Sequence, residues 1–195
     1  MSIVKILIEG YARPGKNDNY IASSATILIE DSDKKILVDP GCNRELLVQS
    51  LNKNNLRPKD IDIIFLTHYH PDHIINIRLF PEHDIYDGNI IYHNDEEIEF
   101  VEKIPGTNIE IIETPGHANE HASLLVFTDE GRYAIAGDIF WWEDEQEQNI
   151  DYESLINLED QFVKDEQKLK NSREKILKIA DFIIPGHGKM FKVVK

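Results

Sequence analysis

The sequence predicts a mixed α/β fold built from layers of strands and helices. Eight short apolar runs, rich in Ile, Val, Leu or Phe and bounded by Gly, Pro, Asp or Asn, are typical of strands. Helical patterns interrupt these strand runs, which favours mixed layers over an all-β fold. Five of the runs end at an aspartate or a histidine, so side chains able to bind metal gather at strand ends.

The first three runs, IVKILIEG, SSATILIED and KKILVDPG, each predict a strand. RELLVQSLNKNN, residues 44–55, predicts a short helix, and a second short helix is expected to start near His73. The remaining runs, IDIIFLTH, NIEIIETPGH, ASLLVFTDEG, RYAIAGD and FIIPGH, again predict strands. Residues 155–180 predict one long amphipathic helix, because one face would carry Leu155, Leu158, Phe162, Leu169, Ile176 and Ile179.

Length and composition indicate a single globular domain over residues 1–195. Hydrophobic residues make up 41% of the chain and charged residues 29%, as in folded proteins. No apolar run approaches the ~20 residues that a membrane-spanning helix needs, and MSIVKILIEG lacks the pattern of a secretory signal. Cys42 is the single cysteine and cannot form an internal disulfide, so a cytoplasmic location is expected.

The formal net charge of −15 bears on the choice of partner. Proteins that bind nucleic acid usually carry a basic patch, whereas here basic residues are interleaved with acidic ones, as in VKDEQKLKNSREKILK. Unaided binding of RNA or of an anionic membrane is therefore disfavoured, although bound metal cations can create a local positive site. A small molecule is the expected partner, with RNA as the alternative.

Five apolar runs deliver a metal-binding type of side chain to the loop at their end. These residues are Asp39, His68, His117, Asp138 and His187. Rigid elements that display polar groups on loops commonly support catalytic sites. Such a convergence is harder to obtain by chance than one histidine-rich loop, so we expect a site at these strand ends.

The stretch LTHYHPDHI has the composition of a zinc site. In an extended segment alternate residues face the same way, so His68, His70 and Asp72 would point toward one locus. Pro71 favours extended geometry at His70, and His73 would turn toward a second locus. Imidazole and carboxylate groups suit zinc, which takes three or four such ligands. A surface loop that happens to be rich in histidine is the less favoured interpretation.

THYHPDH resembles the H-x-H-x-D-H motif of the metallo-β-lactamase superfamily. VDPG, TPGH, AGD and PGHG resemble the other metal-site motifs of that family in the same order. The resemblance covers nearly the whole chain and implies a four-layer αβ/βα sandwich of two mixed β-sheets with outer helices. It also implies a first metal bound by His68, His70 and His117, and a second bound by Asp72, His73 and His187. Asp138 would bridge the two, and Asp39 would anchor the histidine loop from behind the ligands.

The same resemblance implies a metal-dependent hydrolase with two zinc ions per chain, or else iron or manganese. Zinc lowers the pKa of bound water to about 7, so a metal-bound hydroxide forms at neutral pH. With Asp72 as the catalytic residue that orients it, this nucleophile would attack a small ester, thioester, lactone or lactam. ILIEGY and SREKILKIADFIIPGHGKMFKVV are also similar to animal metallo-β-lactamase-domain proteins associated with RNA 3′-end processing. A ribonuclease or other phosphodiesterase is therefore the alternative within the class.

Other branches of the superfamily differ from this chain. Flavodiiron proteins carry Glu where His70 stands, and glyoxalase II-like enzymes add a C-terminal helical domain for which no room follows His187. Superfamily nucleases insert a further domain that clamps the substrate, and no such insertion is expected here. Persulfide dioxygenases share the first motif but use a single iron, so an iron oxidoreductase is the alternative from another class. A protein that binds metal without catalysis is the third hypothesis.

Four further features carry weaker expectations. His121 is expected as a polar residue at the rim of the site, with contact to the substrate or to the metal ligands as the alternative. Cys42 is expected to pack as a small hydrophobe, with a position near the site as the alternative. One of Trp141 and Trp142 is expected in the core and the other at the cleft or at a dimer contact, which leaves a homodimer open. The acidic segment WWEDEQEQNIDYE, residues 141–153, is expected either to border the cleft and repel polyanions or to be a solvated loop.

Overall fold

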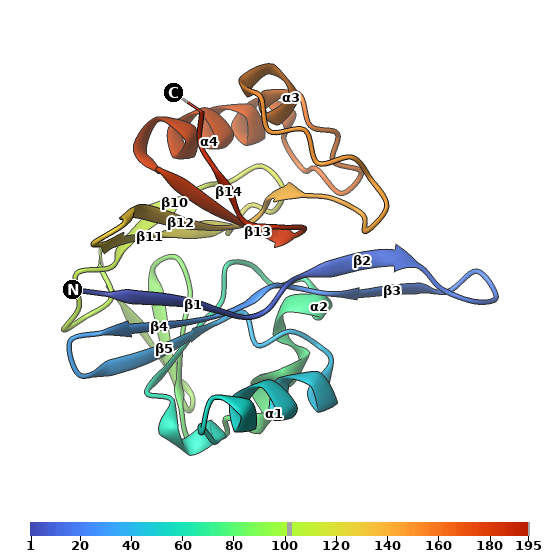
Figure 1. Ribbon diagram of the computed structural model, residues 1–195. Helices are drawn as coiled ribbons and strands as arrows, with labels where there is room; N and C mark the ends of the chain where they lie inside the picture. The colour runs from blue at the N-terminus through green and yellow to red at the C-terminus, as the bar shows by residue number, and fades with distance from the viewer. Residues whose placement is uncertain (101–102, 195) are drawn as a thin grey trace.

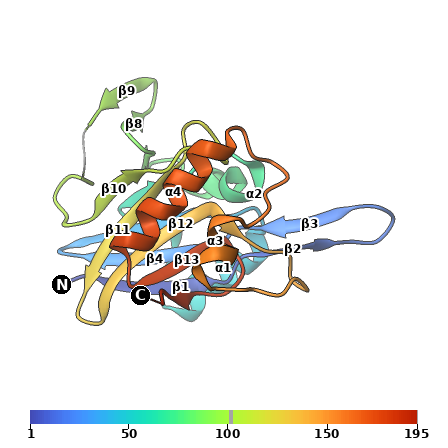
Figure 2. The same ribbon diagram turned by 90° about the horizontal axis from the view of Figure 1, so that it is seen from above.

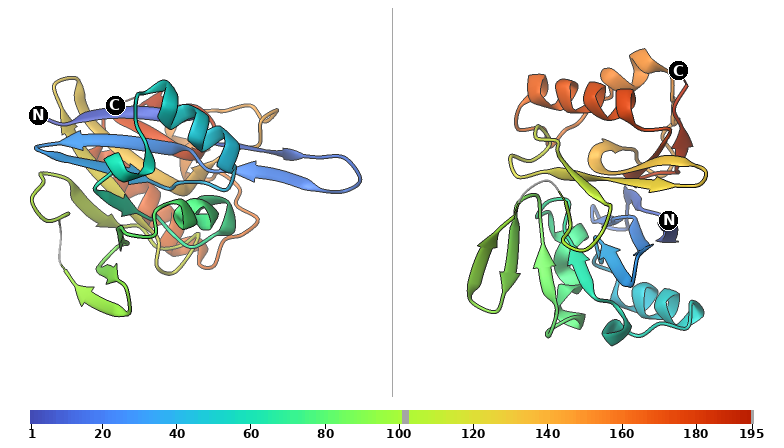
Figure 3. Two further views of the ribbon diagram at one scale, coloured as in Figure 1. Left: turned by 90° about the horizontal axis from the view of Figure 1, so that it is seen from below. Right: turned by 90° about the vertical axis from the view of Figure 1, so that its left-hand side faces the viewer.

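Two β-sheets stack face to face and carry helices on their outer surfaces (Figure 1; Figure 3, right). The computed structural model describes residues 1–100 and 103–194. The order of layers confirms the predicted αβ/βα sandwich, and that the whole chain forms a single domain stays a prediction. None of the helices in the described part of the chain combines the length and apolar character required to cross a membrane.

The first sheet has seven strands in the order β1-β4-β5-β6-β7-β8-β9. β5 pairs in parallel with β6, and β6 with β7, whereas the other neighbours are antiparallel. Because β5 and β6 are parallel, the residues that follow them leave the sheet side by side at one edge. The strands are β1 (Ile3–Ile8), β4 (Thr26–Asp31), β5 (Lys34–Val38), β6 (Ile63–Phe65), β7 (Asp84–Tyr86), β8 (Ile90–His93) and β9 (Glu96–Glu99).

The second sheet has five strands in the order β10-β11-β12-β13-β14, and only β12 and β13 are parallel. Its strands are β10 (Glu110–Glu113), β11 (Ala122–Thr128), β12 (Gly131–Trp141), β13 (Phe182–His187) and β14 (Phe191–Lys192). A separate hairpin of β2 (Tyr11–Pro14) and β3 (Tyr20–Ser23) projects beyond both sheets (Figures 1 and 2).

Helices cover the outer faces of the two sheets. α3 (Tyr152–Ile156) and α4 (Glu166–Ile179) lie on the five-stranded sheet, and α1 (Arg44–Lys53) lies on the seven-stranded sheet (Figures 1 and 2). Shorter turns complete this side: α2 (Pro71–Ile74) and the 3-10 helices η1 (Pro58–Asp60) and η2 (Ile75–Leu79). α1 begins where the side chain of Asn43 accepts a hydrogen bond from the Leu46 amide, an ordinary N-cap.

Three apolar clusters fill the three spaces between the layers. Within β4, Ile27 and Ile29 face the opposite sheet, whereas Leu28 faces α1, as the two-residue period of a strand requires. α4 buries Leu169 and Ile176 against the five-stranded sheet. Burying one such aliphatic side chain contributes about 1.5–3 kcal/mol, so these layers hold the strand ends in fixed positions.

The predicted helix over residues 155–180 is wrong in its first half. α3 ends at Ile156, and α4 does not begin until Glu166. The amides of Lys164 and Asp165 both donate to the carbonyl of Gly116, at 2.8 and 3.0 Å, and Asp165 caps α4. These contacts to a distant loop replace the hydrogen bonds that a continuous helix would make.

The loop between α3 and α4 is held from inside by a buried arginine. Arg173 in α4 is 1% exposed and donates to the carbonyls of Ile139, Ile156 and Leu158. Phe162, which the predicted helix would have buried, lies in this loop and is 47% exposed. The loop therefore carries its residues toward the strand ends.

Candidate metal centre

The predicted site residues meet at one end of the stacked sheets. Asp39 follows β5, and His68 and His70 lie in the loop after β6. Asp72 and His73 lie in α2, and His117 lies in the loop after β10. Asp138 lies inside β12 and His187 ends β13, so the expectation that each stands in a loop beyond its strand is wrong for these two.

The position of Asp138 follows from an irregularity in β12. The register with β13 shifts between Ile135 and Gly137 and again between Gly137 and Trp141. Irregular pairing of this kind re-aims side chains beside active sites. The Asp138 carboxylate is therefore directed into the site, where it is 5% exposed.

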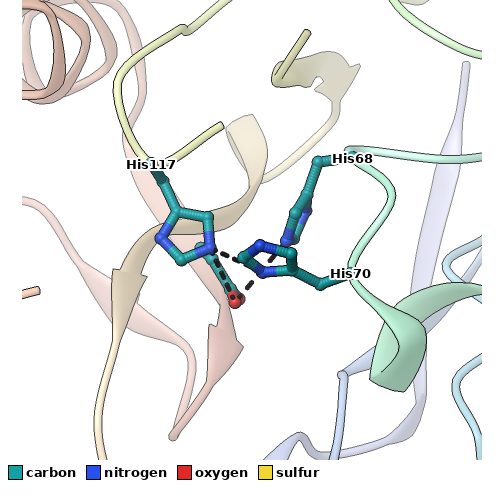
Figure 4. A group of neighbouring side chains, drawn as sticks. His68, His70 and His117 are labelled. Carbon is teal, nitrogen blue, oxygen red and sulfur yellow. Dashed lines mark hydrogen bonds and ion pairs between the residues drawn. The ribbon is translucent and has the colours of Figure 1, made fainter. Parts of the chain in front are cut away.

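The structure gathers the potential ligand atoms into two groups, each within 4.8 Å. Figure 4 shows the three imidazoles of the first group converging. The first group is His68, His70, His117 and Asp138. The second group is Asp72, His73 and His187. These are the groups that the family resemblance implies, and their role as metal ligands stays a prediction.

Asp138 lies between the two groups. Its Oδ2 atom is 3.7 Å from Nε2 of His68 and 3.5 Å from Nε2 of His117. Its Oδ1 atom is 3.2 Å from Nε2 of His73 and 3.7 Å from Nε2 of His187. One carboxylate thus presents one oxygen to each group, which is the arrangement of a bridging ligand.

Asp72 belongs with the second group, so the expectation that it shares a locus with His68 and His70 is wrong. The extended segment ends at His70, and α2 begins at Pro71. The side chain of Asp72 therefore follows helical geometry, and its Oδ2 atom is 3.1 Å from Nε2 of His187.

Hydrogen bonds at Nδ1 fix the tautomers of four histidines. Nδ1 of His73 donates to Asp39 at 2.8 Å, that of His117 to Asp160 at 2.7 Å, and that of His187 to the Tyr11 carbonyl at 3.1 Å. The hydroxyl of Thr67 donates to Asp39, so its oxygen accepts from Nδ1 of His68 at 3.0 Å. In a neutral ring, a hydrogen on Nδ1 leaves Nε2 with a lone pair directed into the site.

His70 is turned the other way, because its Nδ1 atom lies 3.0 Å from Nε2 of His117. One of these two nitrogens must carry a hydrogen and donate it to the other, unless a cation takes the place of that hydrogen. The spacing is near the edge of about 3.3 Å expected for a tetrahedral site with nitrogen bonds of about 2.0 Å.

Buried atoms without partners support the fit of a metal. Nε2 of His68 is buried and makes no hydrogen bond, and Nε2 of His73 and Oδ1 of Asp138 face each other at 3.2 Å with no further hydrogen-bond partner. An unpaired buried polar atom costs roughly 1–3 kcal/mol, so three in one place point to a ligand that satisfies them together. The nitrogen and carboxylate donors suit a divalent transition metal.

Charge and burial set the pKa values of the metal-free site. Burial lowers the pKa of His68 well below the ordinary value. Burial also opposes a charge on His73, but Asp138 and Asp39 raise the pKa of His73 well above the ordinary value. Despite its own burial, Asp138 beside His73 and His187 has a pKa well below the usual range. The metal-free site therefore contains an ionised Asp138 and a protonated His73.

Metal binding is accordingly expected to release about one proton from His73. Its raised pKa means that the proton is held at neutral pH and lost only as pH rises, so a metal at Nε2 must displace it. Affinity should then fall about tenfold for each unit of pH below neutrality, per proton displaced. Calorimetric titration with zinc, in two buffers of different ionisation enthalpy, measures the proton count. An affinity that does not change with pH would contradict the assignment.

Asp39 lies behind the candidate ligands and contacts the segment that carries them, and its supporting role stays a prediction. Its carboxylate accepts from the Thr67 amide and hydroxyl at 2.9 and 2.7 Å and from His73. Its backbone adopts φ 47°, which is uncommon for a residue other than glycine. Asp39 thereby ties the end of β5 to both the histidine loop and α2.

Asp160 is a supporting residue that the sequence did not reveal. Its Oδ2 atom accepts from Nδ1 of His117 across 43 positions of sequence, and its side chain is 1% exposed. The loop that replaces the predicted helix is what brings it there. An Asp-x-Phe turn, in which its Oδ1 atom accepts from the Phe162 amide, is too common to have identified it.

Replacing Asp160 with alanine is expected to weaken binding of the first metal by about 10–100-fold, the usual effect of losing such a partner. His117 would lose the acceptor that holds its ring and tautomer. The matched control is Glu159→Ala, because Glu159 is exposed and adjacent. Competition with a chelator of known affinity measures the change, and equal affinities in the two variants would contradict the role.

His121 is buried rather than at the rim, so that expectation is wrong. It is 1% exposed, its Nδ1 atom lies 2.9 Å from the hydroxyl of Thr114, and its ring lies beside His68. Burial, reinforced by His117, lowers the pKa of His121 to about 3. It is a neutral packing partner of the histidine loop.

The tryptophans divide as expected. Trp142 is 2% exposed and packs in the cluster under α4. Trp141 lines a cavity of about 430 Å³ that opens over the metal centre. Cys42 lines the same cavity and is half-buried, so it lies near the site.

The acidic segment reaches this cavity through Trp141 alone, and two of its acidic residues contact the β2–β3 hairpin. Glu143 accepts from the Tyr20 hydroxyl at 2.8 Å, and Asp144 pairs with Arg13 at 2.6 Å. Two of its acidic groups are therefore engaged in contacts rather than merely solvated. Whether the segment repels polyanions stays a prediction.

Comparison with known proteins identifies a family model and relatives that resemble the chain. The model of the Metallo-beta-lactamase superfamily matches residues 21–88. Metallo-beta-lactamase domain-containing protein 1 of Xenopus laevis is 34% identical over 202 residues, with 98% of this chain and 82% of that protein covered. Probable metallo-hydrolase MJ0296 of Methanocaldococcus jannaschii is 30% identical, with 78% and 70% covered.

Solved structures agree on the fold. A putative metallo-beta-lactamase from Thermotoga maritima superimposes with a TM-score of 0.75 at 22% identity, covering 98% of this chain and 99% of that one. AidC, a dizinc quorum-quenching lactonase, gives a TM-score of 0.68 at 18% identity, with 91% and 78% covered. From its relatives, its fold and its motifs, the chain belongs to the metallo-beta-lactamase superfamily.

Proposed function

We propose that this protein is a metal-dependent hydrolase that binds two zinc ions and cleaves a small, uncharged ester, thioester, lactone or lactam. The observation that carries the proposal is Asp138, whose two oxygens face two separate groups of histidine and aspartate. Bound zinc lowers the pKa of water to about 7 and polarises a carbonyl oxygen. The name of the archaeal relative, a probable metallo-hydrolase, supports the class.

Asp72 is the proposed catalytic residue. It lines the cavity, and its Oδ2 atom lies 3.1 Å from Nε2 of His187. Although burial opposes ionisation, the hydrogen bond from His187 and the charge of His73 lower the pKa of Asp72. An ionised carboxylate at this point can orient a water molecule and accept its proton. Proton transfer by a positioned group contributes roughly 10²–10⁴-fold to rate.

The test begins with elemental analysis of protein purified without added metal. About two zinc ions per chain are expected, whereas one iron would favour the dioxygenase alternative. Hydrolysis of p-nitrophenyl acetate, a simple thioester, a lactone and RNA is then compared with and without a chelator. Metal-dependent cleavage of a small substrate, reduced about 100-fold or more by Asp72→Asn, supports the proposal. Cleavage of RNA far faster than of every small substrate would replace it with a nuclease.

A further inference from the structure

The cavity over the metal centre has a polar floor and apolar walls. His70, Asp72, Asp138 and His187 contribute to its floor. Its walls come from three elements that are distant in sequence: the β2–β3 hairpin, η2, and the loop between α3 and α4. The volume of about 430 Å³ is that of a small-molecule site.

Three large apolar side chains around this cavity remain exposed. Tyr20 is 48% exposed, Ile75 43% and Phe162 47%. A single exposed hydrophobic residue needs no explanation, but three that line one cavity form a patch, and such patches mark binding surfaces. The ring of Phe162 lies 6.0 Å from that of His70, so the patch reaches the metal centre.

The hairpin wall is fixed in place before any ligand binds. The Tyr20 hydroxyl donates to Glu143 and is thereby engaged, which leaves the ring of Tyr20 as the surface offered to the cavity. Asp144 holds the neighbouring strand through Arg13 and through Ala12, whose amide donates to the Asp144 carboxylate and whose carbonyl accepts from the Asp144 amide. A preformed wall reduces the entropy that binding must overcome.

The charges around the cavity exclude an anionic side arm. Among the residues that the structure describes, neither lysine nor arginine lines this cavity, whereas Asp72 and Asp138 do. A carboxylate or phosphate on the part of the substrate that leaves the metal centre would meet no cationic partner. An apolar arm would cover Ile75 and Phe162 instead.

We infer that the cleft selects substrates whose acyl arm is an uncharged hydrocarbon chain, with Ile75 and Phe162 as the specificity-determining residues. The inference rests on the proposed hydrolase function, because it places the reacting carbonyl at the metal centre and the chain along the apolar walls. Hydrolysis then breaks the bond between the acyl carbon and its leaving group. Water supplies the hydroxyl to the acid product and the proton to the leaving group.

The activity test uses zinc-loaded protein and p-nitrophenyl acetate, butyrate, hexanoate and octanoate. The value of kcat/KM should rise by about fourfold for each methylene that the cleft buries. Ile75→Ala and Phe162→Ala should each lower the ratio of hexanoate to acetate by several-fold. Phe127→Ala is the matched control, because Phe127 is 40% exposed in β11 and outside this cavity. A chain of equal length ending in a carboxylate, the mono-p-nitrophenyl ester of adipic acid, should react more slowly than hexanoate.

A binding test without catalysis accompanies it. Calorimetry with 2-pentanone, 2-heptanone and 2-nonanone should give a Kd that falls with chain length in the parent and changes less in Ile75→Ala and Phe162→Ala. Metal-dependent cleavage of acetate, with no effect of chain length or of either variant, would overturn the inference and leave the hydrolase proposal standing. Faster reaction of the adipate ester would also overturn it. If no ester, thioester, lactone or lactam is cleaved, the hydrolase proposal fails, and the ketone series alone decides whether the cleft accepts apolar chains.

Discussion

Replacing His68 or His117 with alanine is expected to abolish stable binding of the first metal while most of the fold persists. Each residue directs an Nε2 lone pair into the first group, and each ring is held by a hydrogen bond at Nδ1. Removing a ligand should cost more than the roughly 10–100-fold loss of affinity that follows removal of a supporting partner. Both residues lie in loops outside the three apolar clusters, so the layers retain their packing.

Bound metal and far-UV circular dichroism, measured on the same samples, test this expectation. His93→Ala is the control, because His93 is exposed and pairs with Asp84 away from the centre. The control should retain its metal, and all three variants should retain the secondary structure of the parent. Full occupancy in both His68→Ala and His117→Ala would end the assignment of the first group.

The buried strands were predictable because their signal is local. Every one of the eight apolar runs contains a strand of the structure, and six of these strands lie inside the two sheets, whereas β1 and β10 lie at an edge. A strand covered on both faces must be apolar along its length, whatever its neighbours. β6, whose residues Ile63, Ile64 and Phe65 are all buried, is the clearest case.

The exposed elements were missed because they carry no such signal. β9 reads EEIE with every residue exposed, and β3 reads YIAS with exposure at its first two positions. Backbone pairing with a neighbour, rather than burial, makes these segments strands. The error over residues 155–180 has the same origin, since contacts to Gly116 decide where α4 begins. No sequence pattern within residues 155–180 can reveal a hydrogen-bond partner as distant in sequence as Gly116.

The site could be predicted further than the fold because its residues recur in motifs. Each position of the motif has an expected role in binding metal, and the structure brings the residues at these positions together. The motif does not identify the residues that hold the candidate ligands in place. Asp160 reaches His117 from a loop that the sequence predicted as helix, and His121 is buried by packing against His68. Both depend on tertiary contacts rather than on spacing.

Replacing Gly186 with alanine is expected to disrupt both metal groups at once. A Cβ atom at this position would lie 1.8 Å from Oδ1 of Asp138, far closer than atoms can approach. The carboxylate would have to move, and it is the one group that faces both halves of the site. Its neighbours leave little freedom, because Asp138 is 5% exposed and β13 is paired on both sides.

The expected result for Gly186→Ala is loss of bound metal together with a decrease in the free energy of unfolding of about 1–3 kcal/mol, as for other overpacked sites. Gly15→Ala in the β2–β3 hairpin is the matched control, because its nearest neighbour is the flexible side chain of Ile21 at 3.1 Å. Metal content is measured on both variants as purified. Chemical denaturation is measured on both variants after removal of metal, which separates the two effects. Because an ordinary loss of stability leaves the metal affinity of the folded fraction unchanged, a destabilised Gly186→Ala that still binds both ions at parental affinity would show that Asp138 does not bridge them.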